Sequence, residues 1–423
     1  MQAAGFTHLE KFSLLNRTLA WYSQDSCQGL LKLWCGFPES ADRIEGVPVF
    51  QHPLPALKIK GKKVKVPIIQ GGMGIGVSLS PLARAVAKEG GVGIVSSACL
   101  DRLLSKRNGR ALSTYEATLE EVSLAKAEGG VAGINVMVAL ARDYDDSVKA
   151  AIDAGADVII SGGGLPLHLP GVKDPGDTAL VPVVSSARAL ELICKKWERL
   201  SYRPDAVVLE GPLAGGHLGF SFDQIHLESN RLENLFFSVK EMALKYGGFP
   251  VIVAGGIYTH DDIVKFLRLG ADGVQMGTRF LATNESSASP GYKQAVVDAR
   301  KDDILVAREP GSPCGMPFMV IKSSPMFRSA LERKREPCCD KGYILARNKE
   351  GAFSRCPARE DNKDTFCICN GLLSSAGYNP FSEEPLYTVG ANGYRVERIL
   401  SVKSLMDELT SGVAETVPTS LVA

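Results

Sequence analysis

Eight short apolar runs recur between residues 66 and 277, and most are followed by glycine or small polar residues. Runs of four to six apolar residues without polar alternation are typical of strands buried on both faces, as in parallel sheets. The runs are VPIIQ (66–70), VGIVS (92–96), AGINVMV (132–138), DVIIS (157–161), VPVVS (181–185), DAVVLE (205–210), PVIVA (250–254) and GVQMG (273–277).

Helix-like segments separate the runs, as in SPLARAVAKEG (80–90), YDDSVKAAIDAGA (144–156) and THDDIVKFLRLGA (259–271). In the last segment Thr259 is the predicted N-cap and Gly270 follows the predicted end. Alternating strands and helices predict a parallel sheet. Eight units in about 210 residues match an α/β fold of the closed (β/α)8 TIM barrel type.

A doubly wound open sheet is the rival architecture. Such a sheet is expected to carry G-x-G-x-x-G after its first strand, a spacing that GGMGIG (71–76) does not have. We therefore predict the barrel over residues 56–330, preceded by an N-terminal extension over 1–55. Trp21 and Trp34 suggest a short helix in that extension. Residues 331–423 are predicted to form a cysteine-rich segment that packs on the barrel.

The composition of this 423-residue chain bears on which classes of partner it can bind. The formal net charge of +1 gives no field that would attract nucleic acid or an anionic membrane. No run reaches the roughly eighteen apolar residues that span a bilayer, and the first residues lack the features of a secretory signal. We expect a cytoplasmic protein that acts on a small molecule. The sequence leaves the oligomeric state open, and a homo-oligomer is compatible with it.

Five of the ten cysteines cluster near the C-terminus, at Cys338, Cys339, Cys356, Cys367 and Cys369. A zinc ion or an iron–sulfur cluster needs about four thiolates, which this cluster contains. The usual C-x2-C pairs are missing, however, and buried thiols that behave as small hydrophobes are the alternative. No metal ligand is assigned.

The strongest phosphate signal is the pair AGGI (254–257) and MGTRF (276–280), after the seventh and eighth runs. Barrels frequently bind a phosphate at this place through backbone N–H groups. Gly255, Gly256 and Gly277 would let the backbone approach the phosphate oxygens, and Thr278 can add a hydroxyl donor. The alternative is that these residues only make tight strand-to-helix turns.

Two further segments lie at predicted strand ends, where barrel enzymes place their chemistry. Gly71, Gly72 and Met73 offer main-chain groups and one soft side chain to a planar ring, or simply form a turn whose methionine fills the core. Asn135 interrupts an apolar strand and needs a hydrogen-bond partner if buried, either a heterocycle or a neighbouring strand end.

His217 follows the sixth run within EGPLAGGHLG (210–219) and is the predicted catalytic residue. A histidine exchanges protons near neutral pH, and this position faces the active end of a barrel. His168 is a weaker candidate, in a loop after the fourth run. A G-x-S-x-G motif is absent from the sequence, so hydrolase chemistry has no support.

Taken together, PIIQGGMG, GINVMV, ISGGGLPLHLP, EGPLAGGHLG, VIVAGGI and GADGVQMGTRFL resemble the nitronate monooxygenase family, formerly called 2-nitropropane dioxygenases. Flavin-dependent enoyl reductases of bacterial fatty-acid synthesis share these motifs. The likeness covers roughly residues 60–330, and CICNGLLSSAGY (367–378) is similar to the closing segment of many bacterial members.

The resemblance implies a barrel that binds FMN. Gly71, Gly72 and Met73 would line the isoalloxazine ring, Asn135 would contact the flavin, and His217 matches the active-site histidine. The remaining positions that match cofactor or phosphate contacts are Gly215, Gly256, Gln275, Met276, Gly277 and Thr278. Glu210 stands where many relatives have glutamine, and Leu213 replaces a glutamate that often precedes the AGGH motif, which predicts a different preference for substrate charge.

The resemblance implies oxidation of alkyl nitronates by FMN and O₂, giving a carbonyl compound and nitrite. One alternative is an NAD(P)H-dependent reductase of an enoyl thioester, because both activities use the same cofactor cradle. A second alternative is a non-redox barrel enzyme that binds a phosphorylated metabolite, which the phosphate motifs alone permit.

Overall fold

The computed structural model describes residues 54–334, 346–347, 353–354, 356, 365–378 and 383–413. The predicted helix around Trp21 and Trp34 lies outside the described residues, as do Cys338 and Cys339. Residues Phe50–Ala423 belong to one compact unit. The division of the chain into extension, barrel and cysteine-rich segment stays a prediction.

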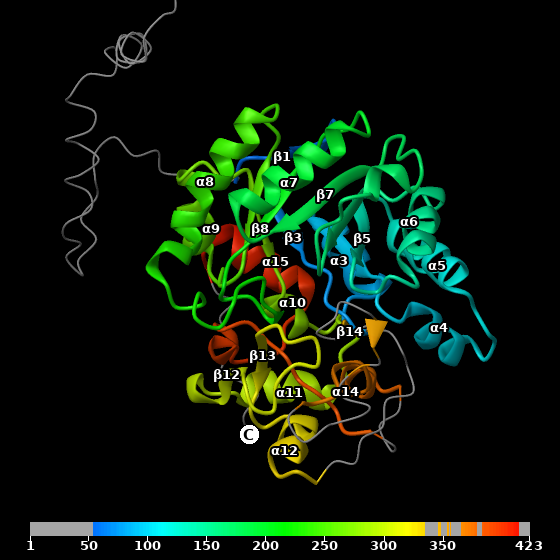
Figure 1. Cartoon of the computed structure of the whole chain (residues 1–423), viewed down its shortest axis with the longest axis vertical. Helices are drawn as coiled ribbons and strands as arrows, with labels where there is room; N and C mark the ends of the chain where they lie inside the picture. The colour runs from blue at the N-terminus through cyan, green and yellow to red at the C-terminus, as the bar shows by residue number, and fades with distance from the viewer. Residues whose placement is uncertain are drawn as a thin grey trace, which may run out of the picture. The chain divides into compact units, whose positions relative to one another are not determined.

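Eight parallel strands close into a barrel (Figure 1). Each predicted apolar run forms one strand, and β11 pairs with β3 to close the ring, with Gln275 opposite Ile69. The (β/α)8 TIM barrel predicted from the sequence is therefore confirmed. The strands are β3 (Ile68–Gln70), β4 (Val92–Ser96), β5 (Val131–Met137), β6 (Val158–Gly162), β7 (Ala179–Val184), β8 (Val207–Glu210), β10 (Val251–Ala254) and β11 (Gly273–Met276).

Helices follow the strands and cover the outside of the barrel (Figure 1). The α9 helix begins as predicted, because the Thr259 hydroxyl accepts a hydrogen bond from the Asp262 N–H at 3.2 Å and the Asp262 carboxylate accepts one from the Thr259 N–H at 2.9 Å. These helices are α3 (Ser80–Lys88), α4 (Leu100–Asn108), α5 (Thr114–Lys126), α6 (Tyr144–Asp153), α7 (Ala187–Glu198), α8 (Leu232–Lys245), α9 (His260–Arg268) and α10 (Thr278–Leu281).

Two apolar layers follow from the strand pattern. Alternate side chains of one strand enter different layers: Ile69 belongs to the cluster inside the barrel, whereas Ile68 packs with the helices. The inner cluster also contains Leu57 and Val64, from the hairpin of β1 (Leu57–Ile59) and β2 (Lys62–Val64). The residues of both clusters are apolar, so the inside of the barrel and the layer between strands and helices are packed core. The reactive groups must therefore lie outside these two layers.

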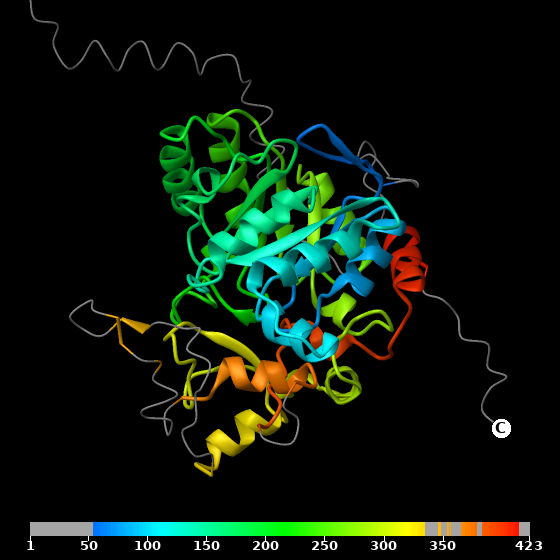
Figure 2. The same cartoon turned by 90° about the vertical axis from the view of Figure 1, so that its right-hand side faces the viewer.

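A second group of elements is not part of the barrel sheet, and all of its members except β9 follow β11 in the chain. Strands β9 (Gly216–His217), β13 (Phe318–Ile321) and β12 (Ile304–Ala307) form an antiparallel sheet. Figures 1 and 2 both show the yellow and orange elements gathered on one side of the barrel. The helices of this group are α11 (Pro290–Asp298), α12 (Pro325–Leu331) and α14 (Ile368–Ser375), and the short pair β14 (Ala346–Arg347) and β15 (Phe353–Ser354) lies between the last two in sequence.

The last helix, α15 (Val402–Ser411), returns to the barrel and packs against α3 and α9. Short 3₁₀ turns complete the described elements, at η1 (Leu169–Gly171), η2 (Glu228–Asn230), η3 (Lys301–Asp303) and η4 (Gly393–Arg395). In the part of the chain that the structure describes, no helix is both long enough and apolar enough to cross a bilayer.

Candidate active site

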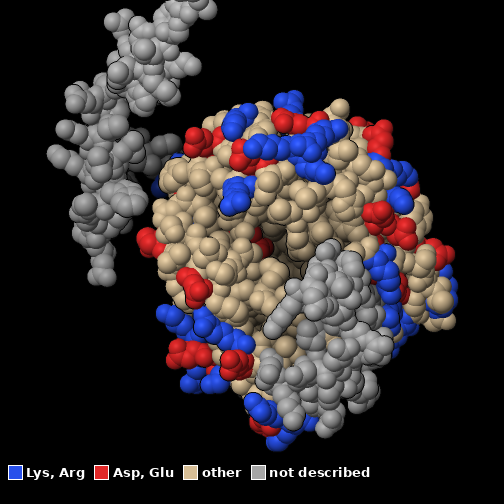
Figure 3. Space-filling model, in the orientation of Figure 1, with Lys and Arg blue, Asp and Glu red and all other residues tan. Residues whose placement is uncertain are grey.

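A cavity of about 370 Å³ lies at the carboxyl ends of the barrel strands. Figure 3 shows a hollow on this face, with mostly uncharged residues around it. Thirteen of the residues that the sequence singled out line this one cavity: Gly71, Gly72, Met73, Asn135, Glu210, Gly215, His217, Gly255, Gly256, Gln275, Met276, Gly277 and Thr278. The structure therefore brings them together, and their individual roles remain proposals.

The loop after β3 is held open by hydrogen bonds that leave its glycines facing the cavity. The Ser78 hydroxyl accepts a hydrogen bond from the Met73 N–H at 2.9 Å, and the Gln70 amide donates to the same hydroxyl at 2.8 Å. A β-carbon on Gly72 would lie 2.3 Å from the Asn135 β-carbon. Only glycine fits here, so the backbone of the loop stays exposed to a ligand.

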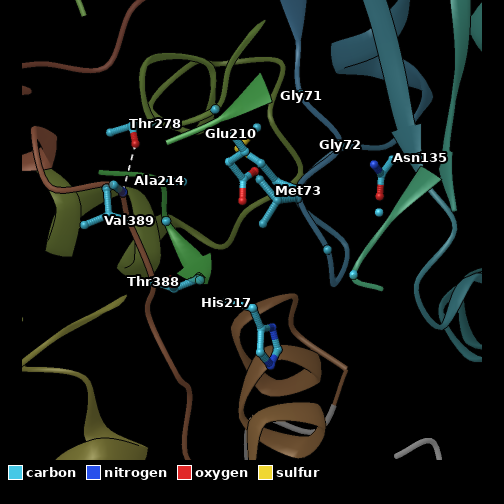
Figure 4. Close-up of a pocket in the computed structure, with 18 of the residues that line it drawn as sticks. Gly71, Gly72, Met73, Asn135, Glu210, Ala214, His217, Thr278, Thr388 and Val389 are labelled. Carbon is cyan, nitrogen blue, oxygen red and sulfur yellow. Dashed lines mark hydrogen bonds between the residues drawn. The ribbon is translucent and has the colours of Figure 1, made fainter. Parts of the chain in front are cut away.

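The glycines after β10 and β11 line the part of the cavity where the sequence predicts a phosphate. Gly255 and Gly256 have φ angles of +92° and +87°, in the region that favours glycine. The Thr278 hydroxyl accepts a hydrogen bond from the Gly390 N–H at 3.0 Å, drawn as the dashed line in Figure 4. This hydroxyl keeps its own proton free to donate to a ligand.

Gln275 carries an unsatisfied polar atom at the cavity. Its Oε1 is buried and has no hydrogen-bond partner among the described residues. A buried acceptor without a partner is costly, and a donor on a bound heterocycle would satisfy it. Together with the glycines that no side chain can replace, this acceptor shows that the residues present fit the flavin that the sequence predicts.

Glu210 ends β8 and lines the same cavity as Met73 (Figure 4). Within the part of the chain that the structure describes, no hydrogen bond or ion pair offsets the removal of water from its carboxyl, and burial raises its pKa to about 7. The carboxyl therefore holds its proton up to neutral pH. A glutamine would offer an amide in the same place without any titration.

His217 is fixed by the small antiparallel sheet rather than by a barrel strand. It pairs with Phe318 of β13, and the two rings meet edge to face with centroids 4.9 Å apart. Figure 4 shows its imidazole well apart from the Glu210 carboxyl, although both side chains line the same cavity. The cavity thus has a titratable group on the barrel side and another on the side of the added sheet.

Sequence reasoning missed the residues that close the cavity from beyond the barrel. Apolar side chains of Leu140, Met316, Phe318, Ile368 and Leu372 form much of this wall. Thr388, Val389, Gly390 and Asn392 add to it near Thr278. The motif CICNGLLSSAGY (367–378) and the glycines of TVGANG (388–393) were the available signals, but no strand pattern placed either segment at the barrel mouth.

His168, the weaker candidate, lies elsewhere. Its side chain is exposed, 3.5 Å from Asp145, and does not line the cavity. Cys356 and Cys367 are buried in an apolar cluster with Phe366. Among the described residues, no group of three or more histidine, cysteine or acidic side chains is arranged to hold a metal ion. Cys338 and Cys339 lie outside those residues.

Comparison with known proteins gives the family. Residues 56–412 match the model of the family described as nitronate monooxygenase. A probable nitronate monooxygenase of Staphylococcus saprophyticus is 38% identical over 102 residues, which cover 24% of this chain and 28% of that protein.

A longer match is the 5-hydroxy-7a-methyl-1-oxo-octahydro-1H-indene-4-carboxyl-CoA dehydrogenase of Mycobacterium tuberculosis. It is 26% identical over 294 residues, or 69% of this chain and 72% of that enzyme.

Two solved structures share the architecture. FabK of Thermotoga maritima is 26% identical, with a TM-score of 0.57 over 81% of this chain and 91% of its own. Nitroalkane oxidase of Streptomyces ansochromogenes is 21% identical, with a TM-score of 0.57 over 82% and 95%, which supports the fold. Since the family model spans most of the chain, the protein belongs to the nitronate monooxygenase family and is a flavin-dependent oxidoreductase.

Proposed function

We propose that the protein uses FMN to oxidise alkyl nitronates with O₂, giving a carbonyl compound and nitrite. The observation that carries the proposal is the position of His217, which faces the same cavity as the glycine-lined cradle and the unsatisfied Gln275 oxygen. An imidazole in that place can bind an anionic substrate beside a flavin. Family membership supports the same reaction class.

The cradle residues would hold the cofactor. The backbone of Gly71 and Gly72, with Asn135 and Gln275, offers polar groups to a flavin ring, and the turns at Gly255–Gly256 and Gly277–Thr278 offer N–H groups and a hydroxyl to a phosphate. The two turns lie together and suit a single phosphate group, which FMN carries. Bound FMN supplies the electron transfer between nitronate and O₂, which no side chain of this chain provides.

The remaining chemistry falls to the protein. His217 orients the nitronate, interacts with its negative charge or moves a proton. Glu210, protonated below about pH 7, adds no negative charge that would repel an anionic substrate. The apolar wall, which includes Ile368 and Leu372, offers the substrate an uncharged surface. The cavity therefore suits an anion with an apolar chain.

Oxygen uptake tests this function. Flavin-loaded protein mixed aerobically with propyl nitronate is expected to consume O₂ and release nitrite, and heat-released cofactor is expected to be FMN. A flavin-loaded protein that consumes no O₂ with any alkyl nitronate would contradict the proposal. A released cofactor other than FMN would contradict the cofactor assignment alone.

A second candidate is an NAD(P)H-dependent reductase of an enoyl thioester. Two observations favour it: the apolar wall accommodates an acyl chain, and the relative from Mycobacterium tuberculosis is named for a carboxyl-CoA substrate. Anaerobic mixing separates the two functions, since NADH or NADPH is expected to bleach the flavin of a reductase. Family membership leaves the non-redox alternative without support.

A further inference from the structure

A second reactive group shares the cavity with His217. Cys314 lines the cavity wall, in the tight turn that precedes β13. The turn is closed by the Gly315 N–H, which donates to the Ser312 carbonyl at 3.0 Å. Because His217 pairs with Phe318, four residues further along the same segment, the sheet fixes the thiol and the imidazole relative to each other.

Three groups converge on the sulfur of Cys314. The Ser312 hydroxyl lies 2.9 Å from Sγ, and the His217 imidazole and the Met316 N–H lie near enough to lower the pKa of the thiol. A neutral thiol is a weak acceptor that gains little from several donors, whereas a thiolate is stabilised by each of them. The arrangement is therefore suited to a sulfur anion.

The electrostatics agree with this geometry. Burial raises the pKa of the Cys314 thiol, but the hydrogen bond and the charge of His217, with the bonds from Ser312 and Met316, outweigh it and lower the pKa to about 7. Cys194 is the internal contrast, since burial and the charge of Glu198 raise its pKa to about 12. The Cys314 thiol therefore ionises at a lower pH than the Cys194 thiol.

We propose that Cys314, His217 and Ser312 form a nucleophilic site in the cavity wall that takes α,β-unsaturated carbonyl compounds by conjugate addition. The sulfur forms a C–S bond to the β-carbon, and the π pair of the C=C bond moves to the α-carbon. His217 gives the proton it took from the thiol to that α-carbon. The product is a thioether, and nothing is oxidised or reduced overall.

The site makes the enzyme sensitive to electrophiles independently of its oxidation chemistry. An adduct on Cys314 occupies the side of the cavity lined by Met316 and Phe318, so it blocks access to the cavity. The proposal does not rest on nitronate oxidation, because the addition requires only the thiol, the imidazole and the electrophile.

Native labelling of the flavin-loaded full chain with N-ethylmaleimide between pH 5.5 and 9 tests the site, with each cysteine followed by peptide mass spectrometry. Cys314 is expected to react at least about tenfold faster than Cys194 at pH 7, with a midpoint near pH 7. His217→Asn is expected to move the midpoint above about pH 8 and to slow labelling at pH 7 by at least about twofold, because fewer sulfurs are ionised there. The greater nucleophilicity of the more basic thiolate offsets part of that loss.

Other titrating groups require a control. The cavity wall also contains Glu210, Tyr258, Tyr292, Cys99 and Cys369, and Arg308 and Glu309 precede the turn in sequence. Glu210→Gln is therefore the matched variant, and the Cys314 midpoint is expected to stay near pH 7 in it. Ser312→Ala, which leaves the imidazole in place, is expected to raise the midpoint by less than His217→Asn does.

A Cys314 midpoint in the ordinary thiol range of about 8.5, or one that moves with Glu210→Gln and not with His217→Asn, would overturn the proposal. If His217→Asn does not fold, the Ser312→Ala shift and the wild-type midpoint decide the question. Nitronate turnover has no part in the readout, so this test fails or succeeds separately from the proposed function.

Discussion

The guanidinium of Arg279 donates a hydrogen bond to the carboxylate of Glu408 at 2.8 Å. Arg279 directly follows Thr278, which lines the cavity, and Glu408 lies on α15, so this ion pair joins the last described helix to the cavity wall. The Arg279 side chain is only 7% exposed, and its guanidinium also stacks on Tyr258 at 4.5 Å from the ring centroid. Removing one partner of a buried ion pair lowers the stability of the protein, because the other partner keeps its charge without compensation.

We expect Arg279→Met to lower the free energy of unfolding by about 1–3 kcal/mol, because Glu408 then keeps a charge without its partner. The matched control is Lys403→Met, which removes an exposed ion pair with Asp407 on the same helix. That control is expected to cost less than about 0.5 kcal/mol. Urea denaturation measures the free energy of unfolding of both variants. Equal losses would show that the buried ion pair contributes no more to stability than the exposed one.

Gly72→Ala is expected to abolish flavin binding, because the new β-carbon would lie 2.3 Å from the Asn135 β-carbon and would displace the loop or the amide. The ratio of flavin to protein absorbance measures occupancy, and circular dichroism checks the fold. Gly171→Ala is the control, since a β-carbon there meets only Leu200 at 3.7 Å. Full flavin occupancy in Gly72→Ala would show that the loop does not touch the cofactor.

Thr278→Val is expected to weaken FMN binding about tenfold. The change leaves the Gly390 N–H without its acceptor and removes a donor from the phosphate side, at a cost of about 1–2 kcal/mol. Thr278→Ser keeps the hydroxyl and is expected to bind FMN nearly as well as the wild type. Fluorescence titration gives both affinities. An unchanged affinity in Thr278→Val would show that the Thr278 hydroxyl does not contribute to FMN binding.

Glu210→Gln is expected to make stability less dependent on pH. The pKa of Glu210 is about 7 in the folded protein, against an ordinary value of 4.5, so the folded state binds more protons than the unfolded state between these values. Stability therefore falls as pH rises through that window, and the penalty is complete above about pH 7.

The flavin-free variant should thus exceed the wild type by about 1–3 kcal/mol at pH 8 and match it below about pH 4.5. Glu309→Gln, at an exposed position, is the control that should show no such difference. A Glu210→Gln variant with the same stability as the wild type at pH 8 would mean that the carboxyl is ionised without cost in the folded state.

Much of the barrel could be predicted because each of its strands is buried on both faces. A strand buried on both faces needs a continuous apolar run, such as VGIVS at β4. The carboxyl end of each run marks the end of the barrel where the cavity lies. The positions of Gly255 and Thr278 were predicted from the same logic, since Gly255 directly follows β10 and Thr278 lies two residues after the end of β11. Position at a strand end is a local signal that a single sequence carries.

The outer wall of the cavity gave no such signal. Cys314 and His217 are about a hundred residues apart and meet only because β9 pairs with β13. A two-residue strand such as β9 has no period to detect, and Cys314 belongs to a turn. Contacts made by long-range pairing of short segments are set by tertiary packing, which residue patterns do not encode locally.

The most direct test compares flavin-loaded wild type and His217→Ala with propyl nitronate, following O₂ uptake and nitrite release in one assay. We expect rapid turnover by the wild type and a loss of about 10²-fold or more in His217→Ala, with the flavin retained. Absence of nitronate-dependent O₂ uptake by the wild type, or equal rates in the two proteins, would contradict the proposal that His217 acts on a nitronate in this cavity.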